Sequence, residues 1–127
     1  MIQSGTWLYN IDNSGARKVI CIKVLGGYRR RYAKLGDKIL VSIKSLRTKR
    51  RVTSKVLKGE LHSALIVKTK VFGFNFLGNC KKFKTNSVIL LNKNNKLLGT
   101  RIFGGISKFF RYTRFLKILF VSSGILN

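Results

Sequence analysis

The chain has few acidic residues: three Asp and Glu stand against 27 Lys and Arg in 127 residues. Asp12, Asp37 and Glu60 lie too far apart in sequence to indicate a carboxylate pair for general acid and base catalysis. A Ser, His and Asp triad would have to use the single histidine, His62. We therefore expect no enzymatic activity, no catalytic residue, no cofactor and no small-molecule substrate.

Cysteine is also scarce. Cys21 and Cys80 lie far apart, and neither forms a metal-ligand spacing with His62. We expect a buried thiol at Cys21, an incidental thiol at Cys80 and no metal site. A reducing compartment is compatible with both cysteines.

Long apolar runs are missing as well. Stretches such as 88–91 and 118–121 are far too short to cross a bilayer. The first ten residues contain neither a basic region followed by an apolar core nor an Arg-rich transit segment. We therefore expect a chain that begins at Met1 without a targeting segment and that has no membrane partner.

Positive charge is what the sequence has in abundance. The formal net charge of +24 amounts to roughly one net charge for every five residues, and its self-repulsion opposes folding unless a polyanion offsets it. A membrane-surface protein would concentrate cations on one face of an amphipathic helix, whereas here they recur in nearly every turn. Nucleic acid is the favoured partner. A hydrophobic content of 45% with nine Phe still predicts a folded core.

Apolar residues alternate with polar ones in several short runs. This pattern predicts strands at 6–11, 16–25, 38–45, 63–67 and 86–91, with a tight turn at 12–15 between the first two. Residues 46–58 have no periodic pattern and are expected to form a long connection or a second basic finger. The predicted fold is all-β: one domain over 1–127, with a small five-stranded antiparallel barrel, or a sandwich-like variant, over about 1–98.

The alternation also assigns inward faces to two of the strands. The predicted core positions are Ile20, Ile22, Val24, Ile39, Val41 and Ile43. A hairpin loop is expected within 71–84. Over about 99–127 we expect short helical turns at 107–119 that pack on the barrel, followed by a tail. The aromatic residues of this segment are better interpreted as core than as a stacking surface.

The most distinctive basic segment is 28–34, which we call the arm. It places four cations and two Tyr after the Gly26-Gly27 turn, which suits a protruding ribbon laid on phosphates with rings available for stacking. The alternative is a solvated, mobile loop. The predicted RNA-binding residues are Arg17, Lys18, Lys23, Arg29, Arg30, Arg31, Lys34, Arg47, Lys49, Arg50, Arg51 and Lys68.

Several segments together resemble a known family. Residues 12–17, 21–27, 30–37 and 99–104 resemble the universal large-subunit ribosomal protein number fourteen of bacterial type, in order and nearly without gaps from Met1 to about Ile118. The resemblance implies a five-stranded barrel with a protruding ribbon and small C-terminal helices, which acts as a structural constituent of the large ribosomal subunit. It also implies binding to large-subunit rRNA, an inter-subunit bridge to small-subunit rRNA, neighbouring large-subunit proteins, and docking of factors that block subunit joining.

The resemblance carries over a second group of functional residues. Thr100, Arg101 and Lys117 match its motifs at the side that meets the small subunit, and with Arg111 they form our predicted joining face. Two departures alter the C-terminal surface: Gly105 stands where the family usually has Pro, and Phe109 stands where it usually has Glu. This surface is therefore more basic and apolar than the family pattern.

The composition also bears on location. The absence of Pro, the few acids, and the many Lys, Asn, Ile, Leu and Phe residues are typical of an AT-rich coding sequence. Without a targeting segment, this favours an organelle-encoded protein of the mitochondrial ribosome, with the plastid or the cytoplasm of an AT-rich bacterium as alternatives. The other class of function is a free-standing protein that binds or compacts RNA or DNA, which would lack the 99–104 motif.

Overall fold

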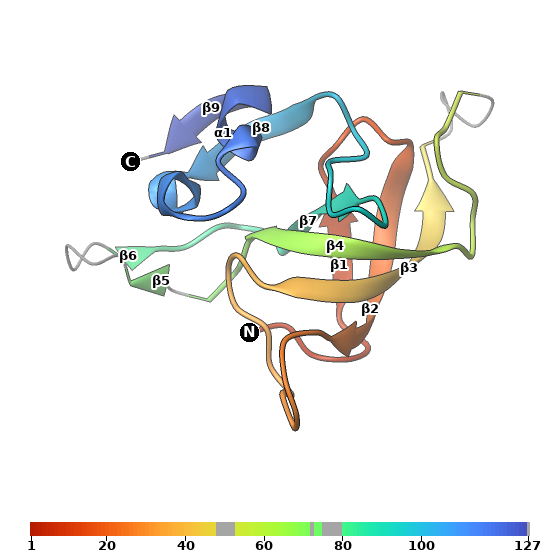
Figure 1. Ribbon diagram of the computed structural model, residues 1–127, viewed down its shortest axis with the longest axis horizontal. Helices are drawn as coiled ribbons and strands as arrows, with labels where there is room; N and C mark the ends of the chain where they lie inside the picture. Colours follow the sequence, from red (N-terminus) through yellow and green to blue (C-terminus); the bar gives the residue numbers. More distant parts are fainter. Residues whose placement is uncertain (48–52, 72, 75–79, 127) are drawn as a thin grey trace.

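Five strands close into a barrel in the computed structural model, which describes residues 1–47, 53–71, 73–74 and 80–126 (Figure 1). In the order of their hydrogen bonding these are β1 (Trp7–Asn10), β2 (Ala16–Val24), β3 (Lys38–Leu46), β4 (Leu61–Lys68) and β7 (Ser87–Leu91). The predicted five-stranded barrel is confirmed. One detail differs, because β1 and β7 close the barrel as a parallel pair, whereas the other neighbours are antiparallel.

The connection after β3 is tied to the turn between β1 and β2. Backbone N–H groups of Arg47 and Lys55 donate to the carbonyls of Gly15 and Ser14 at 2.9 and 3.0 Å. Gly15 has a φ of +106°, and a Cβ on it would lie 2.5 Å from the Cβ of Ser54, so this close approach requires glycine. Residues 48–52, the centre of the predicted second finger, lie outside the described residues.

Farther along, β5 (Gly73–Phe74) and β6 (Cys80–Lys81) pair as the hairpin expected within 71–84.

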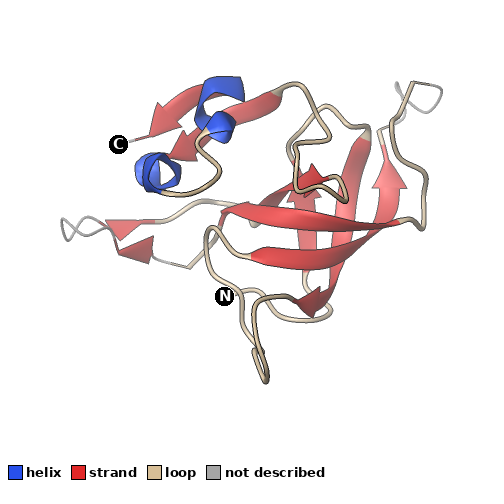
Figure 2. Cartoon of the chain, viewed as in Figure 1, coloured by secondary structure: helices blue, strands red, loops and turns tan. Residues whose placement is uncertain are grey.

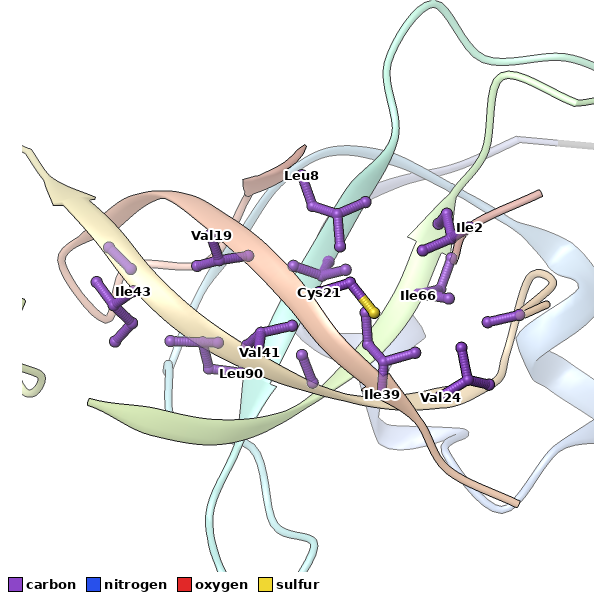
Figure 3. Close-up of a cluster of buried hydrophobic side chains, with 14 of the residues drawn as sticks. Ile2, Leu8, Val19, Cys21, Val24, Ile39, Val41, Ile43, Ile66 and Leu90 are labelled. Carbon is purple, nitrogen blue, oxygen red and sulfur yellow. The ribbon is translucent and has the colours of Figure 1, made fainter. Parts of the chain in front are cut away.

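The barrel interior confirms one predicted strand face and corrects the other (Figure 3). In β3 the predicted Ile39, Val41 and Ile43 are fully buried. In β2, however, Ile22 is 43% exposed and Ile20 is only half-buried, so placing these two residues inward was wrong.

Irregular pairing of β2 with β3 explains the correction. The register shifts at three places, between Ala16 and Lys18, between Lys18 and Val19, and between Cys21 and Lys23. A bulge adds one residue and reverses which side chains face inward. Val19 and Cys21 therefore point into the core before the shift at Cys21 and Lys23, and Val24 does so after it (Figure 3). Burial of the Cys21 thiol, which was predicted, raises its pKa.

The C-terminal segment, residues 102–126, forms an outer layer against one side of the barrel (Figures 1 and 2). It consists of β8 (Ile102–Ser107), the 3-10 helix η2 (Lys108–Tyr112), α1 (Lys117–Val121) and β9 (Ser122–Leu126). The expected short helical turns are present. The sequence analysis missed β8 and β9, which pair in parallel. Among the described residues, no helix has the length and apolar character needed to cross a membrane.

The outer layer buries a second core outside the barrel. Leu65 and Val67 of β4 and Ile89 and Leu91 of β7 face away from the interior, yet each is at most 1% exposed. They pack with residues of the layer that include Ile102, Ile106, Phe110 and Ile118. The neighbouring positions in the same strands, such as Ile66 and Leu90, fill the barrel interior. The β4 and β7 strands are therefore buried on both faces, which accounts for their unbroken apolar runs.

Candidate nucleic-acid interface

The arm projects from the barrel between β2 and β3, as the orange loop in Figure 1. It begins at Gly26 and Gly27 with φ values of +116° and +139°, and Arg29 also has a positive φ of +59°. The C-terminal end of the arm is fixed at the barrel. There Ile2 and Ala33 exchange two backbone hydrogen bonds of 3.0 and 2.7 Å, and both residues are fully buried. The arm is therefore a loop on a firm base.

The predicted cations of the arm fall into two groups. Arg30 makes a 2.5 Å ion pair with Asp37, whose carboxylate also accepts the backbone N–H of Lys34 at 2.7 Å. Arg30 thus braces the base of the arm. Arg29, Arg31 and Lys34 are exposed, with the Arg29 guanidinium 5.3 Å from the centre of the Tyr28 ring, and they are available to an external anion.

A second cationic surface covers the outward side of β1 and β2 and of the part of β3 near Lys44. We call it the bare face because the outer layer packs mainly on β4 and β7. The predicted Arg17 and Lys23 are exposed here, and Lys18 is half-buried with its ammonium group 5.7 Å from the centre of the Tyr9 ring. Trp7 and Lys44 lie on the same face, and the sequence analysis missed both. The signal that could have found them is alternation, because Trp7 precedes the core residue Leu8 and Lys44 follows the core residue Ile43.

Two other predicted cations lie between the barrel and the outer layer. The Arg47 guanidinium is 5.1 Å from the centre of the Phe103 ring and donates to the Asn10 carbonyl at 3.3 Å. Lys68 is half-buried against Phe83 and Gly104, and this burial lowers its pKa. Both side chains thus make internal contacts. The remaining predicted cations, Lys49, Arg50 and Arg51, lie outside the described residues.

The turn between β1 and β2 contains a buried carboxylate. Asp12 is 1% exposed, and one of its oxygens accepts the backbone N–H of Ser14 at 2.9 Å together with the Ser14 hydroxyl and the Asn10 amide. Its other oxygen accepts the backbone N–H of Leu90 at 2.9 Å. Asp12 therefore fixes the turn to β7.

The next residue, Asn13, fixes the predicted joining face. Its side-chain oxygen accepts the backbone N–H groups of Thr100 and Arg101 at 2.8 and 3.2 Å, and its amide donates to the Thr100 hydroxyl at 2.8 Å. Gly99 is needed here because a Cβ would lie 2.8 Å from both Asp12 and Asn13. Thr100 and Arg101 are thus exposed on a backbone held by a side chain that sequence reasoning had treated only as part of a turn.

The other two members of the predicted joining face belong to the outer layer. Arg111 lies in η2 and Lys117 begins α1, and both are exposed. Thr100 and Arg101 lead directly into β8, so all four residues are carried by or adjoin the same layer. No group of His, Cys, Asp and Glu residues that could hold a metal ion occurs in the part of the chain that the structure describes.

The hydrogen bonds from Asn13 connect the 12–15 turn to the 99–101 segment. These two segments belong to the motifs on which the sequence resemblance rests. A family model described as ribosomal protein L14p/L23e matches residues 1–126. The chain belongs to this family. An L14p/L23e protein is a structural constituent of the large ribosomal subunit, so the family resemblance seen in the sequence is confirmed at this level.

The L14p/L23e match includes the two unusual positions of the C-terminal segment, and both have a packing role. A Cβ on Gly105 would lie 2.8 Å from the Leu126 side chain, so glycine lets β9 lie close against β8. Phe109 packs so near Gly36 that a Cβ there would lie 2.8 Å from its ring. Phe109 therefore links the outer layer to the segment that follows the arm.

Proposed function

We propose that this L14p/L23e protein binds large-subunit rRNA through the arm and the bare face, and contacts small-subunit rRNA through the joining face. The observation that carries the proposal is the separation between the exposed cations of the arm and those of the joining face. In Figure 1 the arm extends from one end of the molecule, and the outer layer with the segment leading into it lies at the other. One protein can therefore bind RNA on both sides.

The physical basis of the rRNA contact is uncompensated charge. The three carboxylates are all engaged, since Asp12 is buried in its turn, Asp37 pairs with Arg30, and Glu60 bonds His62. Exposed cations such as Arg29 and Arg31 thus need phosphates to offset their mutual repulsion. Contacts to the phosphate backbone position a protein on RNA without reading its sequence.

The physical basis of the bridge is the fixed backbone at Arg101. Because Asn13 already holds the Thr100 and Arg101 backbone, little backbone entropy is lost when the exposed guanidinium binds a phosphate. A guanidinium also offers a planar pair of donors that matches phosphate oxygens. A factor that blocks subunit joining would act by occupying this same face.

Replacing Arg101 with Glu tests the assignment of the two surfaces. We expect Arg101→Glu to enter large subunits nearly normally, because the arm and the bare face still bind rRNA, and to impair subunit joining through like-charge repulsion. Arg101→Lys should give a milder defect, since it keeps the charge and loses the planar fork. The control is Arg114→Glu, an exposed charge reversal in the same layer. Sucrose gradients distinguish the outcomes: depletion of Arg101→Glu protein from large subunits, with normal joining per incorporated copy, would place Arg101 in the rRNA-binding surface.

We further propose a location and a protein neighbour. The composition supports an organelle-encoded protein of the mitochondrial ribosome, and synthesis of the chain by isolated mitochondria supplied with labelled amino acids would test this.

Exposed apolar residues of the outer layer suit a neighbouring large-subunit protein: Tyr112, Phe120, Ile125 and Leu126. Protection of these side chains from hydroxyl-radical labelling in the assembled subunit would support such a neighbour.

A further inference from the structure

Two aromatic side chains lie next to each other on the bare face. Trp7 is 57% exposed and Tyr9 is 46% exposed, and the intervening Leu8 is buried in the barrel. Trp7 pairs with Ile20 and Tyr9 pairs with Lys18 on β2. Residues two apart on a strand project from the same face at a separation of about 7 Å. Tryptophan is largely buried in most proteins, so the exposure of this single Trp requires an explanation.

Cations surround this aromatic pair. Trp7, Arg17, Lys18, Lys44 and Ser45 line a shallow hollow of about 370 Å³. The carboxylates of the chain do not compensate this charge, because Asp12, Asp37 and Glu60 are held by the contacts described above. The hollow therefore places the Trp7 ring among cations that no carboxylate neutralises, and the neighbouring Tyr9 ring contacts one of them, Lys18.

We propose that Trp7 and Tyr9 form a stacking platform for one or two unpaired nucleotides, with Arg17, Lys18 and Lys44 contacting the adjacent phosphates. This inference rests on the proposed rRNA binding and names the RNA element that the bare face recognises. Aromatic rings beside a cationic groove are the usual means of binding single-stranded RNA. A protein partner fits less well, because the centres of protein interfaces are depleted in Lys.

The single tryptophan provides a direct test of stacking. A ten-residue uridine oligonucleotide should quench the Trp7 fluorescence as it binds. An abasic oligomer with the same number of phosphates should bind with a similar salt dependence and leave the fluorescence nearly unchanged, because it has phosphates without bases. Equal quenching by both oligomers would overturn the platform, since the signal would then reflect charge alone.

Variants test the contribution of the rings to affinity. The double variant Trp7→Leu, Tyr9→Leu should bind the labelled uridine oligonucleotide about tenfold more weakly. Trp7→Phe should retain most of the affinity, because it keeps an aromatic ring. The matched control is Phe120→Leu, which removes an 81% exposed ring from the outer layer and should change nothing. Thermal unfolding confirms that each variant is folded, and unchanged affinity in a folded double variant would overturn the platform.

A parallel measurement separates this inference from the proposed function. If the wild-type protein does not bind a large-subunit rRNA fragment, rRNA binding itself is refuted. If it binds the fragment while the double variant binds the uridine oligonucleotide as well as wild type, only the platform is refuted. In assembled particles, a photoreactive phenylalanine at position 7 should cross-link to RNA, and cross-linking to a protein instead would show that this face has a different partner.

Discussion

The two sides of the barrel wall are built from similar strands but meet different surroundings. On β4 and β7, outward residues such as Leu65 and Ile89 are fully buried by the outer layer. On β1 and β2, outward residues such as Trp7 and Ile22 remain exposed beside cations. The covered side thus supplies stability and fixes the joining face, whereas the bare side is free to bind RNA. Residues of the covered side thus hold the fold, whereas those of the bare side are exposed and available to a partner.

The largest expected effect contrasts one isoleucine from each side. Ile89→Ala should lower the free energy of unfolding by about 2–5 kcal/mol, because it opens a cavity between β7 and the outer layer. Ile22→Ala should cost less than about 1 kcal/mol, since its side chain is already 43% exposed. Urea unfolding of both variants measures the difference. Similar losses of stability at the two sites would mean that burial by the outer layer does not stabilise the covered side more than the bare side.

The second contrast uses carboxylates. Asp12→Ala should destabilise the protein by about 3 kcal/mol, because the buried N–H groups of Ser14 and Leu90 lose a charged acceptor. Asp37→Ala, at the half-buried base of the arm, should cost less, about 1 kcal/mol, because the partner Arg30 is itself exposed. Unfolding midpoints of the two variants check this order. An Asp12→Ala variant as stable as Asp37→Ala would show that the turn is not held to β7 by this carboxylate.

A smaller effect is expected at Asn13, which connects the covered side to the joining face. Asn13→Ala should cost about 1 kcal/mol and loosen the backbone of Thr100 and Arg101. Subunit joining should be impaired less than in Arg101→Glu, while incorporation into large subunits stays normal. Asn94→Ala, at an exposed position in the turn after β7, serves as the control. Wild-type joining by Asn13→Ala particles would exclude a positioning role.

The smallest effect concerns pH. The Leu57 backbone N–H and then His62 hydrogen-bond the Glu60 carboxylate and lower its pKa from the ordinary value of 4.5. A carboxylate with a lowered pKa in the folded state contributes stability above its unfolded pKa and loses it as the pH falls through the folded pKa. Below about pH 4.5, the stability of Glu60→Gln should therefore depend slightly less on pH than that of the wild type. Superimposable unfolding curves of the two proteins across the acid range would contradict this.

The sequence predicted much of the barrel because its strands follow local periodicity. The alternation in 38–45 placed Ile39, Val41 and Ile43 correctly, since β3 keeps a regular pleat there. The same reasoning was wrong at Ile20 and Ile22 because the bulges of β2 depend on its pairing with β3. The β8 and β9 pair was missed for a related reason: its strands are short and glycine-containing, and they are joined through two helical turns.

The sequence predicted which kinds of residue form the candidate interface, but it did not predict how these residues are arranged. Arg29, Arg30 and Arg31 are equivalent in the sequence, but only the fold places Arg30 against Asp37. Likewise, the approach of Asn13 to Thr100 joins residues 87 positions apart. Such long-range contacts decide which cations brace the protein and which are available to RNA. The family resemblance pointed to Thr100, Arg101 and Lys117 of the proposed joining face because its motifs are local in the sequence.

The salt dependence of RNA binding tests most directly whether the exposed cations of the arm bind rRNA phosphates. For wild-type protein and a large-subunit rRNA fragment, log K should fall steeply with log salt, by about 0.7–0.9 per phosphate contact. The double variant Arg29→Ala, Arg31→Ala should remain folded and lose about 1.4–1.8 from that slope. A matched double variant, Lys93→Ala, Lys96→Ala, removes two exposed cations from the turn after β7 and should keep the wild-type slope. A wild-type slope near zero, or an unchanged slope in the arm variant, would contradict phosphate binding by this surface.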